Sequence, residues 1–150
     1  MQVILLIGIP ATGKSTFYKE RFADTHLRIN RDMVRTRHRE RRLFEACLEI
    51  GQSVVVDNTN ISKEVRARFI RPAIDAGATV TGYYFRSVAS ESLDRNTTRS
   101  GAARVPDKAV LSMVKLLQLP SMAEGFQSLF HVRISDRIRF RVEAWNQSTT

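Results

Sequence analysis

The sequence lacks the features that would mark a secreted, membrane-spanning or zinc-binding protein. Its single cysteine, Cys47, has no partner for an intramolecular disulfide, and the apolar stretch around it predicts a buried, unreactive thiol. The three histidines are scattered without the spacing of zinc ligands. The first apolar run, residues 3–9, is too short for a signal peptide or a membrane span. We therefore expect a cytoplasmic protein that contacts no membrane.

Glycine and proline are also scarce, with seven and four among 150 residues, which argues against fibrous and low-complexity chains. The composition is 43% hydrophobic and 26% charged, as in folded globular proteins. A chain of this length buries a substantial core but is too short for two ordinary domains. We therefore expect one domain over residues 1–150.

Acidic residues are outnumbered, 15 against 24 lysines and arginines, which gives a net charge of +9. Such an excess favours a polyanionic partner, although many basic proteins bind no nucleic acid. Seven arginines fall between Arg28 and Arg42. A second cluster comprises Arg133, Arg137, Arg139 and Arg141. The second cluster also fits a solvated helix face or a basic tail, whereas the first surrounds a candidate catalytic acid.

Apolar β-branched runs alternate with helix-like segments along the whole chain. Strands are expected at residues 3–9, 27–30, 54–57, 79–85 and 128–134, and helices at 14–22, 33–50, 62–76, 88–99 and 106–117. This alternation predicts an α/β fold with a mostly parallel sheet that helices cover on both faces. Ser62 and Pro106 suit helix starts, and Gly51 and Gly77 suit helix ends.

The segment GIPATGKS, residues 8–15, fits the phosphate-loop pattern G-x-x-x-x-G-K-S/T and lies between an apolar strand and a helix. Its glycines let successive backbone N–H groups point at phosphates, and the helix N-terminus adds its positive end. Lys14 is expected to bridge phosphate oxygens, and Ser15 to offer its hydroxyl to Mg²⁺. The expected contacts to ATP or another nucleoside triphosphate are Gly8, Ile9, Pro10, Ala11, Thr12, Gly13, Lys14, Ser15 and Thr16.

A phosphate loop predicts nucleotide binding without specifying a reaction, since GTPase switches, AAA-type machines and small kinases share it. The chain is too short for a motor domain with accessory helices, and no NKxD-like segment that would read guanine follows the fourth strand. We therefore expect a kinase. A nucleotide-binding or RNA-binding module without catalysis is an alternative, but it would not explain the acids Asp32 and Asp57.

Ligands of doubly wound sheets lie beyond the carboxyl ends of the strands, so the residues that follow each strand are candidates for the site. Asp32 and Arg35 follow the second strand, three residues apart at a predicted helix start, and should share one helix face. An acid that accepts the attacking hydroxyl's proton and a cation that holds an acceptor phosphate suit phosphoryl transfer. The alternative is that Asp32 merely caps the helix.

Asp57 ends the third strand in the run VVVD, as in a Walker-B element that orients the hydration shell of Mg²⁺, although an Asx turn is an alternative. Further along, Arg95 and Arg99 are spaced i and i+4 on a predicted helix, directly before residues 100–106, which we interpret as a mobile lid. Closure would bring both guanidinium groups onto the triphosphate, where they neutralise developing charge. Surface ion pairs are the alternative role for both arginines.

With these motifs the chain resembles the kinase domain of polynucleotide 5'-hydroxyl kinases, both the phage end-healing enzyme and the kinase half of the animal polynucleotide kinase-phosphatase. The match covers roughly residues 1–132, in order and with similar spacing. It rests on GIPATGKST, INRDMVR, VVVDNTNIS, LDRNTTR, Val105 with Pro106, and PSMAEGF. The phosphate loop is generic, whereas INRD together with DNTN and AEGF is much more specific.

The resemblance implies a P-loop NTPase fold with a five-stranded parallel sheet of order 2-3-1-4-5, a lid that carries arginines, and a role in nucleic acid repair. It also implies that Asp32 is the general base and that Arg35 grips the acceptor phosphate. Asp57 resembles the acid beside the phosphate loop, and Arg95 and Arg99 resemble the lid pair. The expected partners are ATP, Mg²⁺ and single-stranded or end-exposed DNA or RNA with a 5'-hydroxyl.

Two departures separate the chain from the family. The segment between Arg35 and Gly51 is shorter than in the phage enzyme and rich in arginine, and the D-x-D-x-T/V signature of a phosphatase partner is absent. The main alternative is therefore a kinase of a sugar, nucleoside, antibiotic or tRNA-linked acceptor. The arginine cluster favours a polynucleotide, because a neutral metabolite needs no such platform. The sequence does not distinguish DNA from RNA and predicts no oligomeric state.

Overall fold

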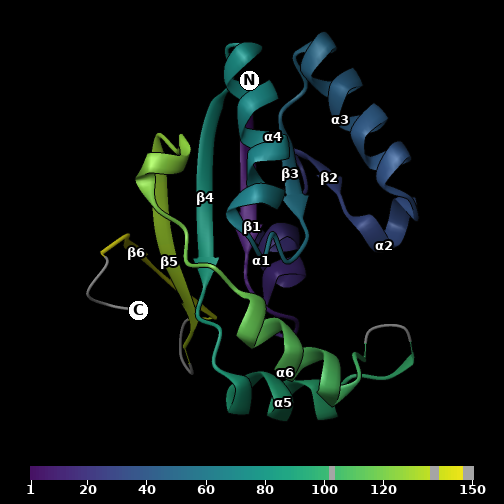
Figure 1. Ribbon diagram of the computed structural model, residues 1–150, viewed down its shortest axis with the longest axis vertical. Coiled ribbons are helices and arrows are strands. Elements are labelled where there is room, and N and C mark those ends of the chain that lie inside the picture. Colours follow the sequence, from purple (N-terminus) through teal and green to yellow (C-terminus); the bar gives the residue numbers. More distant parts are fainter. Residues whose placement is uncertain (102–103, 136–138, 147–150) are drawn as a thin grey trace.

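Six β-strands form one sheet, in a computed structural model that describes residues 1–101, 104–135 and 139–146 (Figure 1). The strands are β1 (Gln2–Ile7), β2 (Leu27–Ile29), β3 (Val54–Asp57), β4 (Thr79–Phe85), β5 (Ser128–Ile134) and β6 (Phe140–Ala144). They lie in the order β2-β3-β1-β4-β5-β6. The first five are parallel to one another, which confirms the predicted order 2-3-1-4-5.

The sixth strand, β6, was not predicted, and it runs antiparallel to β5 at the edge of the sheet. The alternative that the second arginine cluster forms a helix face or a basic tail does not hold for the described residues. Arg133 lies on β5 directly opposite Arg141 on β6, and Arg137 lies outside the described residues. Phe140 anchors β6, because its buried ring packs edge to face on Phe17.

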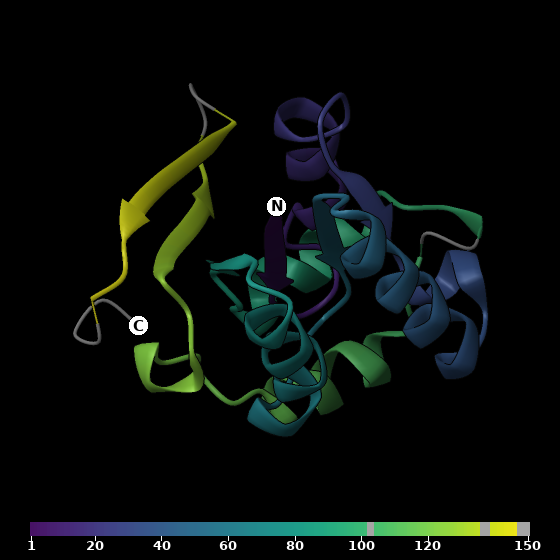
Figure 2. The ribbon, with the colours of Figure 1, turned by 90° about the horizontal axis from the view of Figure 1, so that it is seen from above.

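Helices cover both faces of the sheet, as predicted (Figure 2). On one face lies α1 (Lys14–Arg21), and on the other lie α3 (Arg37–Ile50) and α4 (Lys63–Asp75). The remaining helices are α2 (Arg31–Val34), α5 (Ala89–Thr97), α6 (Asp107–Leu116) and the 3-10 helix η2 (Met122–Glu124). Both α5 and α6 lie beyond the carboxyl ends of β1 and β4, where ligands of parallel sheets bind (Figure 1).

The single helix expected over residues 33–50 is in fact two helices. The first, α2, ends at Val34, because Arg35 adopts a positive φ of 77° that no helix accommodates. Thr36 then caps α3, and its side chain accepts a hydrogen bond from the backbone N–H of Arg39. Asp32 and Arg35 therefore do not share a helix face, contrary to the expectation from their spacing.

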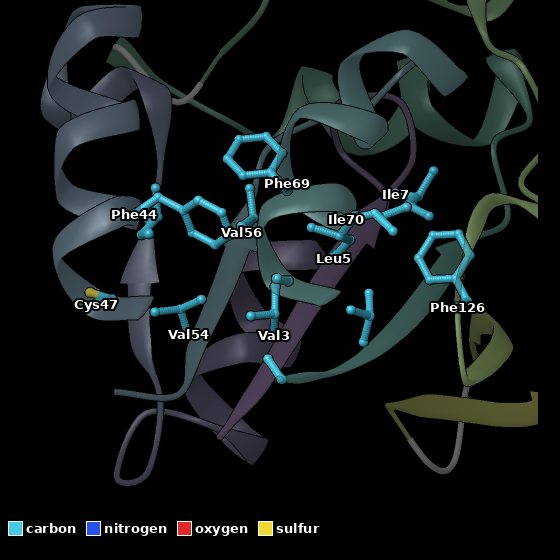
Figure 3. Close-up of a cluster of buried hydrophobic side chains, with 14 of the residues drawn as sticks. Val3, Leu5, Ile7, Phe44, Cys47, Val54, Val56, Phe69, Ile70 and Phe126 are labelled. Carbon is cyan, nitrogen blue, oxygen red and sulfur yellow. The ribbon is translucent and has the colours of Figure 1, made fainter. Parts of the chain in front are cut away.

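Alternating side chains of β1 divide the core into two layers. Val3, Leu5 and Ile7 face the helices α3 and α4 (Figure 3), whereas Ile4 and Leu6 face α1. All five are fully buried, as expected for a central parallel strand. The first layer also contains Phe44, Cys47, Val54, Val56, Phe69, Ile70 and Phe126. This packing fixes β1, and with it the loop that follows.

Cys47 is buried in the first layer of the core, as predicted, and its burial raises the pKa of the thiol. A thiol in this environment is a poor nucleophile, because the reactive species is the thiolate. Among the helices of the described residues, none is both long enough and apolar enough to span a membrane.

Candidate active site

The phosphate loop links β1 to α1 and is braced by the strands on either side of β1. The backbone N–H of Gly8 donates to the carbonyl oxygen of Thr59, which follows β3, at 3.0 Å. The N–H of Ile9 donates to Ser87 Oγ, which follows β4, at 3.1 Å. Inside the loop, Thr12 Oγ1 donates to the carbonyl of Ile9 at 3.0 Å. The conformation of the loop is thus set by three strands rather than by its own sequence alone.

Gly13 is required at its position for two separate reasons. Its φ of 95° disfavours any residue with a side chain, and a Cβ atom there would lie 2.8 Å from Phe140 and 3.3 Å from Ile134. At Gly8 a Cβ would lie 3.1 Å from both the Cβ and the carbonyl oxygen of Phe85. The hairpin of β5 and β6 therefore packs directly behind the loop.

Lys14 opens α1 and is 9% exposed. Its Nζ donates hydrogen bonds to the carbonyl oxygens of Gly8 and Ile9, both at 2.8 Å. Burial lowers the pKa of Lys14 to about 8; the nearby Asp57 carboxylate opposes this shift, and the Arg99 guanidinium adds to it. The loop thus holds a desolvated ammonium group where phosphate oxygens would offset its charge.

Ser15 and Asp57 meet as predicted, and a third residue joins them. Ser15 Oγ donates to Asp57 Oδ2 at 2.9 Å, and the Arg28 Nε–H donates to the same Oδ2 at 2.8 Å. The Arg28 Nη2 also donates to Ser15 Oγ at 3.2 Å. We did not predict Arg28 as a site residue, although it lies on β2 two residues before Asn30.

The oxygen atoms of Ser15 and Asp57 fit Mg²⁺, which takes one or two protein oxygens and completes its octahedron with waters and substrate phosphates. Asp57 is 2% exposed, so its charge is poorly screened by water. Within residues 1–101, 104–135 and 139–146, no group of three or more His, Cys, Asp or Glu residues offers a self-contained metal site. A metal held here would therefore rely on phosphate oxygens.

Two asparagines join the segments INRD and DNTN. Asn30 caps α2, because its Oδ1 accepts from Met33 N at 3.1 Å, and its Nδ2 donates to the carbonyl of Asp57 at 2.6 Å. Asn58 Oδ1 accepts from Arg31 N at 2.8 Å. The cap therefore belongs to Asn30 rather than to Asp32, which is exposed in the first turn of α2. The asparagines of these two segments were not predicted as site residues.

Asn60 and a buried ion pair support the same edge of the sheet. Asn60, 1% exposed, donates from Nδ2 to the carbonyls of Leu6 and Val56 at 2.7 and 3.3 Å, which ties β1 to β3. Arg66 on α4 is fully buried; it donates to the carbonyl of Asn60 at 2.8 Å and pairs with Glu124 Oε1 at 2.7 Å. The AEGF segment thus acts through the scaffold of the site, which its sequence alone did not reveal.

Of the two arginines assigned to the lid, Arg95 contacts the phosphate loop. Arg95 Nη1 donates to the carbonyl of Ala11 at 3.0 Å and also lies 3.7 Å from Glu91. Arg99 is close enough for its charge to lower the pKa of Lys14. The helix α5 ends at Thr97, however, so Arg99 follows the helix instead of sharing its face with Arg95.

Asn96, the buried residue between these arginines, holds the C-terminal end of the predicted lid. Its Oδ1 accepts from Val105 N at 2.9 Å, and its Nδ2 donates to the carbonyl of Val105 and to Asp107 Oδ1. Within residues 100–106, Ala102 and Ala103 lie outside the described residues. Motion of a lid therefore stays a prediction, with Asn96 as its anchor.

A polar pocket of about 400 Å³ opens beside the phosphate loop, on the side of β5 and β6. Thr12 and Arg95 border it at the loop, and Arg86, Arg133 and Arg141 border it farther away. Two residues of the loop that were predicted to contact the nucleoside triphosphate, Pro10 and Thr16, are half-buried and exposed, respectively. The pocket thus adjoins the loop on the side opposite α2, and a nucleotide whose phosphates lay on the loop would have room there.

Comparisons with known proteins agree with this geometry. The family described as AAA domain matches residues 24–120 of the chain. Among solved structures, the chain is similar to Kti12 from Chaetomium thermophilum, determined in complex with ADP-AlF3, with a TM-score of 0.66 and 15% identity. That likeness covers 91% of this chain and 93% of the other. The fold is that of a P-loop kinase-like domain.

Two relatives are more similar in sequence. A bifunctional polynucleotide phosphatase/kinase of Schizosaccharomyces pombe is 27% identical over 137 residues, which cover 87% of this chain and 33% of that protein. Transcription factor bHLH140 of Arabidopsis thaliana is 31% identical over 143 residues, which cover 85% of this chain and 15% of that protein. The chain therefore spans a third or less of the length of these curated relatives.

Proposed function

Because the chain belongs to the AAA domain family and has a P-loop kinase-like fold, we propose that it transfers the γ-phosphate of ATP to the 5'-hydroxyl end of DNA or RNA. The similarity to the phosphatase/kinase of Schizosaccharomyces pombe supports a polynucleotide acceptor. The density of arginines between Arg28 and Arg42 also supports it, since those of them that face the strand would contact its phosphates, and each such contact releases counterions.

The observation that carries this proposal is the pair of hydrogen bonds between the segments INRD and DNTN. Asn30 holds the carbonyl of Asp57, and Asn58 holds the N–H of Arg31. These bonds fix the start of α2 beside the end of β3. The start of α2 carries Asp32, and the end of β3 carries Asp57, which contacts Ser15. Because Asn30 supplies the cap, the Asp32 carboxylate is not committed to the helix.

In the proposed reaction, Asp32 accepts the proton of the 5'-hydroxyl as its oxygen attacks the γ-phosphorus, and the bond from that phosphorus to the β,γ-bridging oxygen breaks. Lys14 and Arg95 contact the loop, and together with Arg99 they would stabilise charge on the transferring group and on the ADP leaving group. Bound Mg²⁺, held through Ser15 and Asp57, would neutralise phosphate charge. Arg35 would grip the phosphate that follows the first nucleoside.

Transfer of radiolabel from γ-labelled ATP tests this proposal directly. The acceptors are a 5'-hydroxyl DNA oligonucleotide, the matching RNA, the same oligonucleotides with a 5'-phosphate, and a panel of sugars and nucleosides. We expect label only on the 5'-hydroxyl oligonucleotides. Labelling of a sugar or free nucleoside with none on either oligonucleotide would overturn the acceptor assignment while leaving the kinase assignment intact.

A further inference from the structure

A second pocket, of about 440 Å³, lies on the other side of the molecule from the pocket beside β5 and β6, in the groove between α3 and α4. Its floor is aromatic: the rings of Phe44 and Phe69 pack edge to face with centroids 5.1 Å apart (Figure 3). Its volume lies within the range of small-ligand sites, about 300–1,000 Å³. We refer to it as the α3–α4 groove.

The rim of the α3–α4 groove is cationic. Arg37 and Arg41 border it from α3, and Arg68 borders it from α4. Within the described part of the chain, Arg41 and Arg68 form ion pairs with carboxylates of their own helices, at 3.7 and 3.8 Å. Exposed pairs of this kind contribute less than about 1 kcal/mol, so both guanidinium groups are readily available to another anion.

Glu40, which borders the groove, has a structural role. It is buried, and its Oε2 accepts a hydrogen bond from Asn58 Nδ2 at 2.8 Å. Asn58 also holds the N–H of Arg31 at the start of α2. The groove therefore connects through one side chain to the helix that carries Asp32, on the acceptor side of the phosphate loop.

We propose that the α3–α4 groove binds a nucleotide of the acceptor strand downstream of its reacting 5' end. Arg41 and Arg68 hold its phosphates, and the base packs on the apolar floor beside Phe44 and Phe69. Phe44 and Phe69 are 2% and 5% exposed, so the floor offers the base an apolar contact rather than an open stacking face, and the cationic rim supplies phosphate contacts that need no sequence preference. The inference rests on the proposed acceptor class, and it adds a second contact point beyond the 5' terminus.

The chain offers matched controls on both helices. Arg42 lies beside Arg41 on α3, and Arg71 lies one turn beyond Arg68 on α4; both are exposed and neither borders the groove. Alanine at any of these four positions removes one positive charge from the same region. Only substitutions at the groove should act on the bound strand, so the comparison separates a site from the general field of the protein.

The first measurement is fluorescence anisotropy of a 3'-labelled, single-stranded 12-mer with a 5'-hydroxyl, titrated at several salt concentrations. We expect Arg41→Ala and Arg68→Ala each to weaken binding by a factor on the order of ten. Each should also reduce the slope of log affinity against log salt by about 0.7, the loss of one single-strand phosphate contact. Arg42→Ala and Arg71→Ala should change affinity less than two-fold.

The second measurement is phosphate transfer to the 12-mer and to a nucleoside 3'-phosphate, which is too short to reach the groove. We expect the groove variants to raise KM for the 12-mer and to leave KM for the short acceptor unchanged. Equal effects of the Arg41 and Arg42 variants on binding of the 12-mer would contradict a strand-binding role of the α3–α4 groove, even if the 12-mer is phosphorylated. If the 12-mer binds with the expected pattern but accepts no phosphate, the result would support strand binding at the α3–α4 groove and would contradict the proposed transfer to a 5'-hydroxyl.

Discussion

Arg28 and Ser15 donate hydrogen bonds to the same carboxylate oxygen, Asp57 Oδ2, and the Arg28 Nε lies 2.8 Å from it. A guanidinium group and Mg²⁺ compete for that oxygen, because both are cations that need its lone pairs. Arg28 is 26% exposed, so its attraction to Asp57 is partly screened and amounts to about 1 kcal/mol. Arg28 therefore sets how tightly the site would hold its metal.

From this relationship we expect Arg28→Ala to bind divalent metal more tightly, by a factor on the order of five. Titration of Mn²⁺ into the protein with ADP present, followed by electron paramagnetic resonance, measures this affinity without turnover. Arg28→Lys keeps the charge and should stay near the wild-type affinity. A weaker metal affinity in Arg28→Ala would instead mean that Arg28 holds Asp57 in position for the metal.

The lowered pKa of Lys14, about 8, predicts that nucleotide binding takes up protons. Phosphate charges beside Nζ favour the ammonium form and raise its pKa, so affinity for ATP should fall as the pH rises above about 8. Calorimetry at pH 8.5 in two buffers of different ionisation enthalpy should reveal proton uptake in the wild type. In Lys14→Ala that uptake should vanish, together with phosphate transfer.

The same pKa also fixes the sign of a stability effect in the ligand-free protein. The unfolded chain, with a lysine pKa of 10.5, binds more protons than the folded protein between about pH 8 and 10.5. The contribution of Lys14 to stability therefore rises with pH across this window. In urea denaturation, the difference in free energy of unfolding between wild type and Lys14→Ala should shift in favour of the wild type from the lower to the upper end of the window.

Asp32→Asn tests the general base. Asparagine keeps the shape and the hydrogen bonding but cannot accept the proton, so we expect turnover to fall by a factor on the order of a hundred or more. Affinity for ATP and the melting temperature should barely change, because Asn30 caps α2. Asn30→Ala is the contrasting variant and should lower stability by about 1 kcal/mol. Near-normal turnover in a folded Asp32→Asn variant that binds ATP would contradict the assignment of Asp32 as the general base.

Arg99→Ala tests whether the arginine that follows α5 acts on the chemistry. If its guanidinium group contacts the transferring phosphoryl group in the transition state, kcat should fall by a factor on the order of a thousand, with little change in ATP affinity. Arg95 contacts the carbonyl of Ala11 on the loop, so Arg95→Ala should also disturb ATP binding. Steady-state kinetics with separate calorimetric affinities distinguishes the two. A raised KM for ATP at constant kcat in Arg99→Ala would reduce its role to ground-state binding.

Glu124→Gln tests the buried ion pair far from the chemistry. Arg66 has no solvent exposure, so removing the carboxylate leaves an uncompensated charge and should lower the free energy of unfolding by about 3–5 kcal/mol. Chemical denaturation measures this loss. Glu143→Gln, at a pair on the exposed edge, should cost less than about 1 kcal/mol. Similar losses in both variants would contradict the burial argument.

The sequence predicted those parts of the fold in which local pattern and tertiary structure agree. The run VVVD forms β3, as predicted, and GIPATGKS runs from the end of β1 into the first turn of α1. Both were predictable because apolar periodicity and glycine spacing are local signals. The break at Arg35 was missed, because a positive φ in a non-glycine residue has no such signal. It depends on Asn30, Asn58 and Thr36, which fix the chain on both sides.

The site residues that the sequence did not predict were missed for one physical reason. Arg28, Asn58 and Arg66 contact partners that are 29, 18 and 58 positions away, respectively, and such pairings leave no periodic trace in a single sequence. Lys14 and Ser15 were predicted because their motif is contiguous. Asp32 and Arg35 were predicted on the same helix face, and that spacing argument failed when the helix ended between them.

The central position of β1 has a consequence for synthesis on the ribosome. This strand precedes both of its neighbours in the chain, yet it pairs on one side with β3 and on the other with β4. Its backbone partners are complete only when residue 85 has left the exit tunnel, and Phe140, which packs behind Gly13, follows much later. Until that point the nascent chain carries β1, which is apolar from Val3 to Ile7, without its neighbouring strands, and it is then open to chaperones and to aggregation.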